Sequence, residues 1–145
     1  MRSFRVLNKS RLLFLFPVII ACSCALRQTE VIVEYDNPLR FVISGSGLVD
    51  YFSVNCHYSS KNTARMCWQI APLEDTDIAT LRKLGPIVYG KVPTGFRQVI
   101  PEGGEPEPIR ENSDTAYSVT LAIRNGGGVN KLFAVRDGKI VAERE

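Results

Sequence analysis

Four cysteines and a single histidine are the side chains of this sequence best suited to nucleophilic or metal chemistry. Cys56 and His57 are adjacent, and adjacent side chains of a β-strand point to opposite faces, so they cannot meet as a nucleophile and its base. With Cys67 they offer three soft ligands, whereas a structural zinc site normally has four. Cys56 and Cys67 lie eleven residues apart and suit a disulfide in an oxidising compartment. We therefore predict a Cys56–Cys67 disulfide and no metal site.

The other short motifs do not predict a catalytic centre. The run Gly126-Gly127-Gly128 lacks the lysine and the strand-to-helix context of a phosphate-binding loop. Acidic side chains such as Asp50 are present, but no pattern places two carboxylates at the separation of ~5–9 Å that glycoside hydrolysis requires. We predict no catalytic residues, no cofactor and no enzymatic activity. An enzyme that acts on cell-wall glycans is the weaker alternative.

A short apolar segment follows a basic N-terminus. Leu12–Ala21 contains ten residues, which as a helix would span roughly 15 Å, well short of the ~30 Å core of a bilayer. Pro17 interrupts the segment, and the residues before it carry no acid and four basic side chains: Arg2, Arg5, Lys9 and Arg11. A charged start, a short apolar middle and small residues behind it are typical of a secretory signal. We therefore predict that residues 1–21 are a signal peptide, and a buried N-terminal helix is the alternative.

The end of this segment, Ile19-Ile20-Ala21-Cys22, resembles the lipobox of bacterial lipoproteins that signal peptidase II cleaves. The resemblance covers about the first 23 residues. It implies that a diacylglycerol is attached to the Cys22 sulfur, that the chain is cut before Cys22, and that the new amine is acylated. Ala21 provides the small residue that the cut requires, whereas Cys24 does not match the pattern. An ordinary A-x-A cleavage site is the alternative, which Ala21-Cys22-Ser23 matches poorly.

Lipidation at Cys22 would determine where the protein resides. Two or three acyl chains hold a protein stably at a membrane, whereas a single chain holds it only marginally. In a Gram-negative cell, Ser23 after the lipidated cysteine implies export to the outer membrane, with the folded domain facing the periplasm. Residues 22–29 would then form a lipidated tether, and residues 30–145 a single domain.

Removal of the signal peptide would change the charge of the protein. The full chain has 18 basic and 15 acidic side chains, a formal net charge of +3. Four of the basic residues and none of the acidic ones precede Cys22, so the mature chain has 14 against 15, a net charge of −1. Binding to nucleic acid needs a clustered basic face. The sequence therefore predicts no nucleic-acid partner.

The mature chain has the pattern of an all-β protein, with short apolar segments separated by turn residues. The predicted strands are Glu30–Tyr35, Arg40–Ser44, Leu48–Tyr58, Arg65–Ala71, Ile87–Val92, Gly95–Ile100, Thr115–Asn125, Lys131–Arg136 and Lys139–Glu143. Asp75–Leu84 has a helical pattern, and the prolines and glycines of Glu102–Asn112 predict a loop. Near-regular spacing of the strands predicts a small immunoglobulin-like or related two-sheet antiparallel sandwich with one short helix. A small closed barrel is the alternative.

A conflict arises within the predicted strand Arg65–Ala71. Cys67 and Trp68 are adjacent, so on a regular strand one of them faces the core and the other faces solvent. A disulfide in the core would then expose Trp68, unless a β-bulge intervenes. The sequence leaves both arrangements open.

Two segments offer candidate partner-binding residues. In Ile87–Phe96, Tyr89 and Phe96 flank glycines and a proline, and they are either core aromatics beside a turn or an exposed anchor for a protein surface. In the acidic loop that follows, Glu105 and Glu107 belong either to a solvated loop or to a rim that meets a basic partner.

A second resemblance links the same region to small uncharacterised bacterial β-sandwich lipoproteins, some of them labelled as immunity proteins of type VI secretion. It covers about Trp68 to Val141 and consists of Tyr89-Gly90, Val92-Pro93, Gly95-Phe96, Pro101, Tyr117, Phe133 and Asp137-Gly138. It implies a fold and assigns no catalytic role. We predict a membrane-anchored periplasmic lipoprotein that acts as a non-enzymatic binding or structural module with a protein partner. The alternative is an immunity or inhibitor lipoprotein that neutralises a toxin or a wall-degrading enzyme.

Overall fold

The computed structural model describes residues 28–73 and 80–142 of the 145-residue chain. These ranges contain one turn of 3-10 helix, η1 (Ser59–Lys61), and the strands β1 (Glu30–Glu34), β2 (Arg40–Ser44), β3 (Val49–Tyr58), β4 (Thr63–Pro72), β5 (Ile87–Val88), β6 (Phe96–Ile100), β7 (Thr115–Ile123), β8 (Val129–Arg136) and β9 (Lys139–Ala142). The predicted signal peptide, Cys22 and most of the predicted tether lie outside the described residues. No helix within the described ranges is long and apolar enough to cross a membrane.

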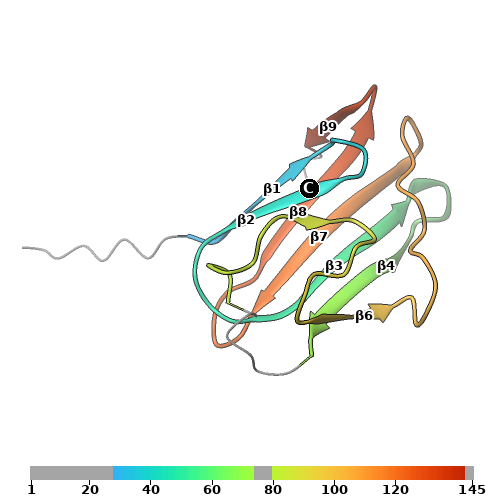
Figure 1. The fold of residues 1–145 in the computed structure, drawn as a ribbon. Coiled ribbons are helices and arrows are strands. Elements are labelled where there is room, and N and C mark those ends of the chain that lie inside the picture. The colour runs from blue at the N-terminus through green and yellow to red at the C-terminus, as the bar shows by residue number, and fades with distance from the viewer. Residues whose placement is uncertain (1–27, 74–79, 143–145) are drawn as a thin grey trace, which may run out of the picture.

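The strands form two antiparallel sheets that confirm the predicted all-β sandwich. Six strands form one sheet in the order β6-β4-β3-β7-β8-β9, and three form the other in the order β1-β2-β5. Figure 1 shows the three-stranded sheet crossing one face of the larger sheet. In the larger sheet, β3–β4, β7–β8 and β8–β9 are hairpins between sequence neighbours, and the turn at Asp137-Gly138 predicts the last of them. The pairings of β3 with β7 and of β4 with β6 join strands that are not consecutive in the sequence.

The strand boundaries follow the predicted ones to within a few residues, with one clear exception. The predicted strand Ile87–Val92 ends after Val88. The Lys91 amide donates to the Val88 carbonyl oxygen at 3.0 Å, and Gly90 adopts a φ of 76°. A residue with a side chain would be strained at that φ, so the glycine allows the chain to turn where the sequence pattern continues.

The first half of the predicted helix Asp75–Leu84 falls outside the described residues, and its described end is not helical. Thr80 forms an isolated β-bridge with Leu48, and a turn follows it. Leu81 is 3% exposed, and its amide donates to the Gly47 carbonyl oxygen at 3.0 Å. The end of this segment therefore packs against the end of the sandwich through a bridge and a buried leucine.

The core lies between the two sheets and contains the inward-facing side chains of alternating strand positions. Phe52 and Val54 of β3 are fully buried. Phe52 has edge-to-face contacts with Phe41 of β2, at 4.9 Å between ring centroids, and with Trp68 of β4, at 6.0 Å. Each large apolar side chain that is fully buried stabilises the fold by roughly 1.5–3 kcal/mol in transfer free energy. The Phe41–Phe52 contact therefore helps to hold the two sheets together.

A β-bulge on β4 resolves the conflict between Cys67 and Trp68. Val54 on β3 lies opposite Trp68, and the next residue, Asn55, lies opposite Met66. Cys67 is therefore the extra residue of the bulge. Because of this insertion, Cys67 and Trp68 are both buried, with exposed fractions of 5% and 0%.

The disulfide predicted from the cysteine spacing is present. Cys56 of β3 and Cys67 of β4 are bonded, with their Cα atoms 5.9 Å apart. Both residues belong to the hydrophobic core. The bond joins positions eleven residues apart, so it links the two strands of the β3–β4 hairpin from the core side.

We expect the double substitution Cys56→Ala/Cys67→Ala to lower the free energy of unfolding by about 2–3 kcal/mol, because the crosslink no longer restricts the unfolded chain. Urea unfolding of the oxidised protein and of the variant measures the difference. Cys24→Ala is the matched control and should leave the midpoint unchanged. Equal midpoints for the double variant and the parent would show that the crosslink does not stabilise the fold.

Candidate functional site

The candidate functional site lies at the end of the sandwich where β3 turns into β4. Tyr58 at the end of β3 lies opposite Thr115 at the start of β7, whereas Val49 at the other end of β3 lies opposite Ile123. The turn η1 joins the two strands, and Asn62 ends it with a left-handed φ of 45°, which asparagine tolerates better than most residues. Two surface cavities flank this hairpin.

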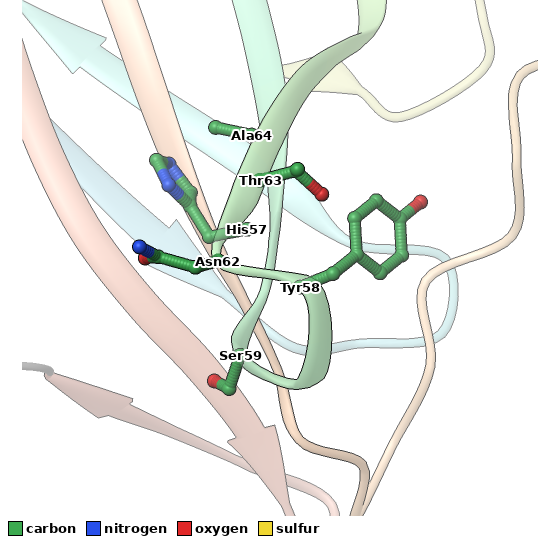
Figure 2. Close-up of a pocket in the computed structure, with 6 residues that line it drawn as sticks. All are labelled: His57, Tyr58, Ser59, Asn62, Thr63 and Ala64. Carbon is green, nitrogen blue, oxygen red and sulfur yellow. The ribbon is translucent and has the colours of Figure 1, made fainter.

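The smaller cavity, of about 230 Å³, is lined by His57, Tyr58, Ser59, Asn62, Thr63 and Ala64. Figure 2 shows His57 and Asn62 on one side of the hairpin and the Tyr58 ring on the other. His57 Nε2 lies 2.9 Å from Ser118 Oγ, and Asn55 Nδ2 donates to the same oxygen at 3.3 Å. Ser118 is 5% exposed, so these bonds tie β3 to β7 and do not present the serine hydroxyl to solvent as a nucleophile.

The predicted loop Glu102–Asn112 is a loop in the structure, and hydrogen bonds hold it against the core. Tyr89, directly after β5, donates its hydroxyl hydrogen to the Glu107 carbonyl oxygen at 2.7 Å. The Arg110 amide donates to the Tyr117 hydroxyl oxygen at 2.7 Å. Two tyrosines that also contribute to the core therefore fix the position of the loop backbone.

A glutamine side chain fixes the start of the same loop. Gln98 Oε1 accepts a hydrogen bond from the indole nitrogen of Trp68 at 3.1 Å. Gln98 Nε2 donates to the carbonyl oxygens of Pro101 at 2.9 Å and Gly104 at 3.0 Å. The buried indole N–H is thus satisfied, as a buried polar group must be, by the same side chain that anchors the loop.

The Glu107 carboxylate binds two guanidinium groups and a phenol. Arg110 Nη2 donates to Oε1 at 3.0 Å, and Arg65 Nη2 pairs with Oε2. Tyr58 donates its hydroxyl hydrogen to Oε2 at 2.8 Å and accepts a bond from Arg65 Nε at 3.1 Å. The Glu107 side chain is 19% exposed, against 62% for Arg65 and 58% for Arg110. The carboxylate is therefore enclosed, while both guanidinium groups reach solvent.

The larger cavity, of about 350 Å³, lies over this cluster and is lined by Tyr58, Ser60, Lys61, Thr63, Ala64, Arg65, Glu107 and Arg110. Three cationic side chains and one carboxylate give the lining a formal charge of +2. The cavity is open to water, so this charge attracts anions without being strongly desolvated.

The residues predicted to bind a partner lie in different environments. Phe96 is 5% exposed and belongs to the core, which is the first of the two alternatives that the sequence left open, so Phe96 is not an exposed anchor. Tyr89 is partly buried, with its ring centroid 5.3 Å from that of Trp68. Glu105 is exposed on the loop, whereas the Glu107 carboxylate is already paired within the chain.

Phe96 is buried because a turn directs it inward at the start of β6. Its amide donates to the Pro93 carbonyl oxygen at 3.1 Å, and Gly95 before it has a φ of 83°. Phe96 then pairs with Pro72 at the end of β4. The glycine and proline that suggest an exposed turn are real turn residues, but the aromatic next to them serves the core.

Sequence patterns do not identify the cationic part of the site. Lys61, Arg65 and Arg110 come from η1, β4 and the Glu102–Asn112 loop, and no spacing connects them. The signal that was available is the alternation of β3, which places Tyr58 on the same face as the core positions of that strand. The loop position that brings Glu107 to Tyr58 is a tertiary feature.

Three potential metal ligands also lie together here. The ligand atoms of Cys56, Cys67 and Glu107 are within 4.8 Å of one another. The two sulfur atoms are bonded to each other, and zinc binds cysteine as a thiolate. In the oxidised protein these residues therefore do not form a metal site.

Comparison of this chain with protein-family models, curated protein sequences and solved structures found no match. The lipobox and the second lipoprotein resemblance remain predictions from the sequence.

Burial raises the pKa of Tyr89 and of Tyr117 above the ordinary value for tyrosine. Desolvation is the largest cause for both residues, and the neighbouring Tyr58 raises each pKa further. Both phenols therefore stay protonated at neutral pH. The protonated state allows Tyr89 to donate to the loop. The hydrogen bond that Tyr117 accepts from the Arg110 amide lowers the pKa of Tyr117, but burial outweighs it.

We expect the free energy of unfolding to fall as the pH rises above about 10, where tyrosine in an unfolded chain ionises. Tyr89 and Tyr117 stay protonated in the folded state, so the folded state binds more protons than the unfolded state in this range, and stability declines with pH. Urea unfolding across the alkaline range measures the slope. Tyr89→Phe removes one of these groups and should make the decline shallower, and an unchanged slope would contradict this explanation.

Proposed function

We propose that this chain is a bacterial lipoprotein, anchored through acylated Cys22 in the outer membrane, whose β-sandwich acts in the periplasm as a non-enzymatic binding module. The observation that carries the proposal is the Cys56–Cys67 disulfide in the core of the domain. Disulfides form and persist in oxidising compartments and are rare in the cytosol. The disulfide therefore supports the export that the predicted signal peptide, residues 1–21, implies.

The short tether supports attachment close to the lipid surface. Six residue steps separate Cys22 from Gln28, the first described residue, so this part of the chain spans at most about 20 Å. Gln28 and Thr29 line a cavity together with Gly127 and Gly128 of the β7–β8 turn and with residues 129–130 at the start of β8. A lipid anchor at Cys22 would therefore hold this end of the sandwich near the membrane.

The β3–β4 hairpin is at the opposite end of the sandwich. Val49 lies opposite Ile123, directly before the β7–β8 turn, and β3 runs from there to Tyr58. These nine residue steps correspond to about 30 Å of extended strand. With the anchor at the first end, η1 and the Glu102–Asn112 loop would point away from the membrane, where a periplasmic partner could reach them.

The fixed loop favours a second candidate function, that of an immunity or inhibitor lipoprotein that neutralises a toxin or a wall-degrading enzyme. Hydrogen bonds to Tyr89 and Tyr117 hold the loop backbone at Glu107 and Arg110. A loop that is already ordered loses less conformational entropy when it binds. A toxin gene next to the gene for this chain would favour this function over that of a general binding module.

Metabolic labelling with a palmitate analogue in a Gram-negative host tests the anchor. We expect label on the full chain and on Cys24→Ala, the matched control, and no label on Cys22→Ala, because the acyl chains require the Cys22 sulfur and the amine exposed by cleavage. Mass spectrometry of the N-terminal peptide should give a chain that begins with acylated Cys22.

A mature N-terminus at another residue, with an unmodified Cys22 thiol, would contradict the proposal. Label that persists on Cys22→Ala at the level of the parent would also contradict it.

A further inference from the structure

We propose that the cavity over Glu107 binds an oxyanion group, a carboxylate or a phosphate, that is carried by a periplasmic ligand. The inference deepens the proposed function and rests on it for the presence of that ligand. It differs from both alternatives that the sequence left open for the acidic loop, a solvated loop or a rim that meets a basic partner. The difference follows from where the loop places the Glu107 carboxylate.

The first support is the balance of charge in the cavity. The carboxylate of the loop that lines the cavity, Glu107, is neutralised by Arg65 and Arg110 from within the chain. Lys61 lines the same cavity, and its ammonium group has no hydrogen-bond or ion-pair partner in the part of the chain that the structure describes. The lining is therefore cationic although the loop sequence is acidic, and a basic partner would meet like charge here.

The second support is that contacts within the chain already hold the Arg65 side chain in place. Arg65 is held by Glu107 and Tyr58, with its Cζ 5.4 Å from the centroid of the Tyr58 ring. A guanidinium group has five N–H donors, and these bonds use the Nε–H and one Nη2–H of Arg65. The remaining donors stay available, and a held guanidinium loses less side-chain entropy on binding than a free one.

The third support is the match between the cavity and the proposed group. Guanidinium groups recognise carboxylate and phosphate oxygens through paired, charge-assisted hydrogen bonds. A volume of about 350 Å³ accommodates such a group together with several atoms of the molecule that carries it, since a water molecule occupies about 30 Å³ in the liquid. Ser60 and Thr63 also line the cavity and can provide hydroxyl donors.

The test follows the arginine Nε–H resonances of the full chain in a neutral detergent by NMR. Inorganic phosphate and acetate are titrated separately at low ionic strength, with sodium chloride at matched ionic strength as the reference. We expect a saturable shift of the Arg65 Nε–H with phosphate, acetate or both, and none with chloride. A response to phosphate alone identifies a phosphate ligand, and a response to acetate alone identifies a carboxylate ligand.

Lys61→Gln tests the site without disturbing the fold, because Lys61 is exposed. Loss of its charge should weaken the anion affinity by at least about threefold. This effect is smaller than that of a buried charge-assisted hydrogen bond, because water screens a contact at an exposed position. Arg82→Gln makes the same change of charge at an exposed position, next to Leu81 at the opposite end of the sandwich, and should leave the affinity unchanged.

The inference would be overturned if neither anion gave a saturable shift. It would also be overturned if Lys61→Gln and Arg82→Gln weakened the anion affinity equally. The anchor is judged by a separate measurement. A protein labelled at Cys22 that binds neither anion contradicts this inference alone, whereas an unlabelled protein that binds contradicts the proposed anchor alone.

Discussion

The extra residue at Cys67 on β4 is the constraint on which the rest of the structure depends. Strand side chains alternate between faces, so inserting one residue exchanges the faces of every position beyond it. With the bulge, Trp68 and Cys67 are both buried, and Arg65 lies directly opposite Cys56, on the core side of the hairpin. A regular strand with Trp68 in the core would direct Cys67 and Arg65 to the other face, away from the disulfide partner and from Glu107.

Hydrogen bonds to the Glu102–Asn112 loop complete this arrangement by fixing the position of the loop. The second sheet contains the two-residue strand β5, and the chain after β5 meets the Glu102–Asn112 loop through Tyr89 and Glu107. Trp68, Tyr89 and Tyr117 each place an aromatic body in or against the core and a polar atom on the loop side. Because buried polar atoms are costly when unpaired, each of these bonds favours the one loop position that satisfies it. The same position brings the Glu107 carboxylate to the two guanidinium groups.

Sequence patterns predicted much of the fold because its causes are local. Alternation in Thr115–Ile123 and the turn at Asp137-Gly138 define β7, β8 and β9, and the cysteine spacing defines the disulfide. The sequence did not determine whether β4 contains a bulge, because Cys67 and Trp68 both suit the core. Only the pairing of β4 with β3 shows that the bulge is present and that both side chains are buried. The charge cluster was not predicted because it joins three segments through loop packing. The sequence left Phe96 between core and surface because turn residues do not reveal which way the next side chain points.

In this account the bulge and the Cys56–Cys67 disulfide hold the charged Glu102–Asn112 loop in place. Hydrogen exchange of the full chain tests this connection most directly. The amides to follow are those of Arg110, which donates to Tyr117, and Asn112, which donates to Val135. If the bulge and its disulfide hold the hairpin and loop as one unit, reduction should speed exchange at both amides more than in the β7–β8 pairing. Exchange at Arg110 and Asn112 that is the same in the oxidised and reduced protein would contradict the account.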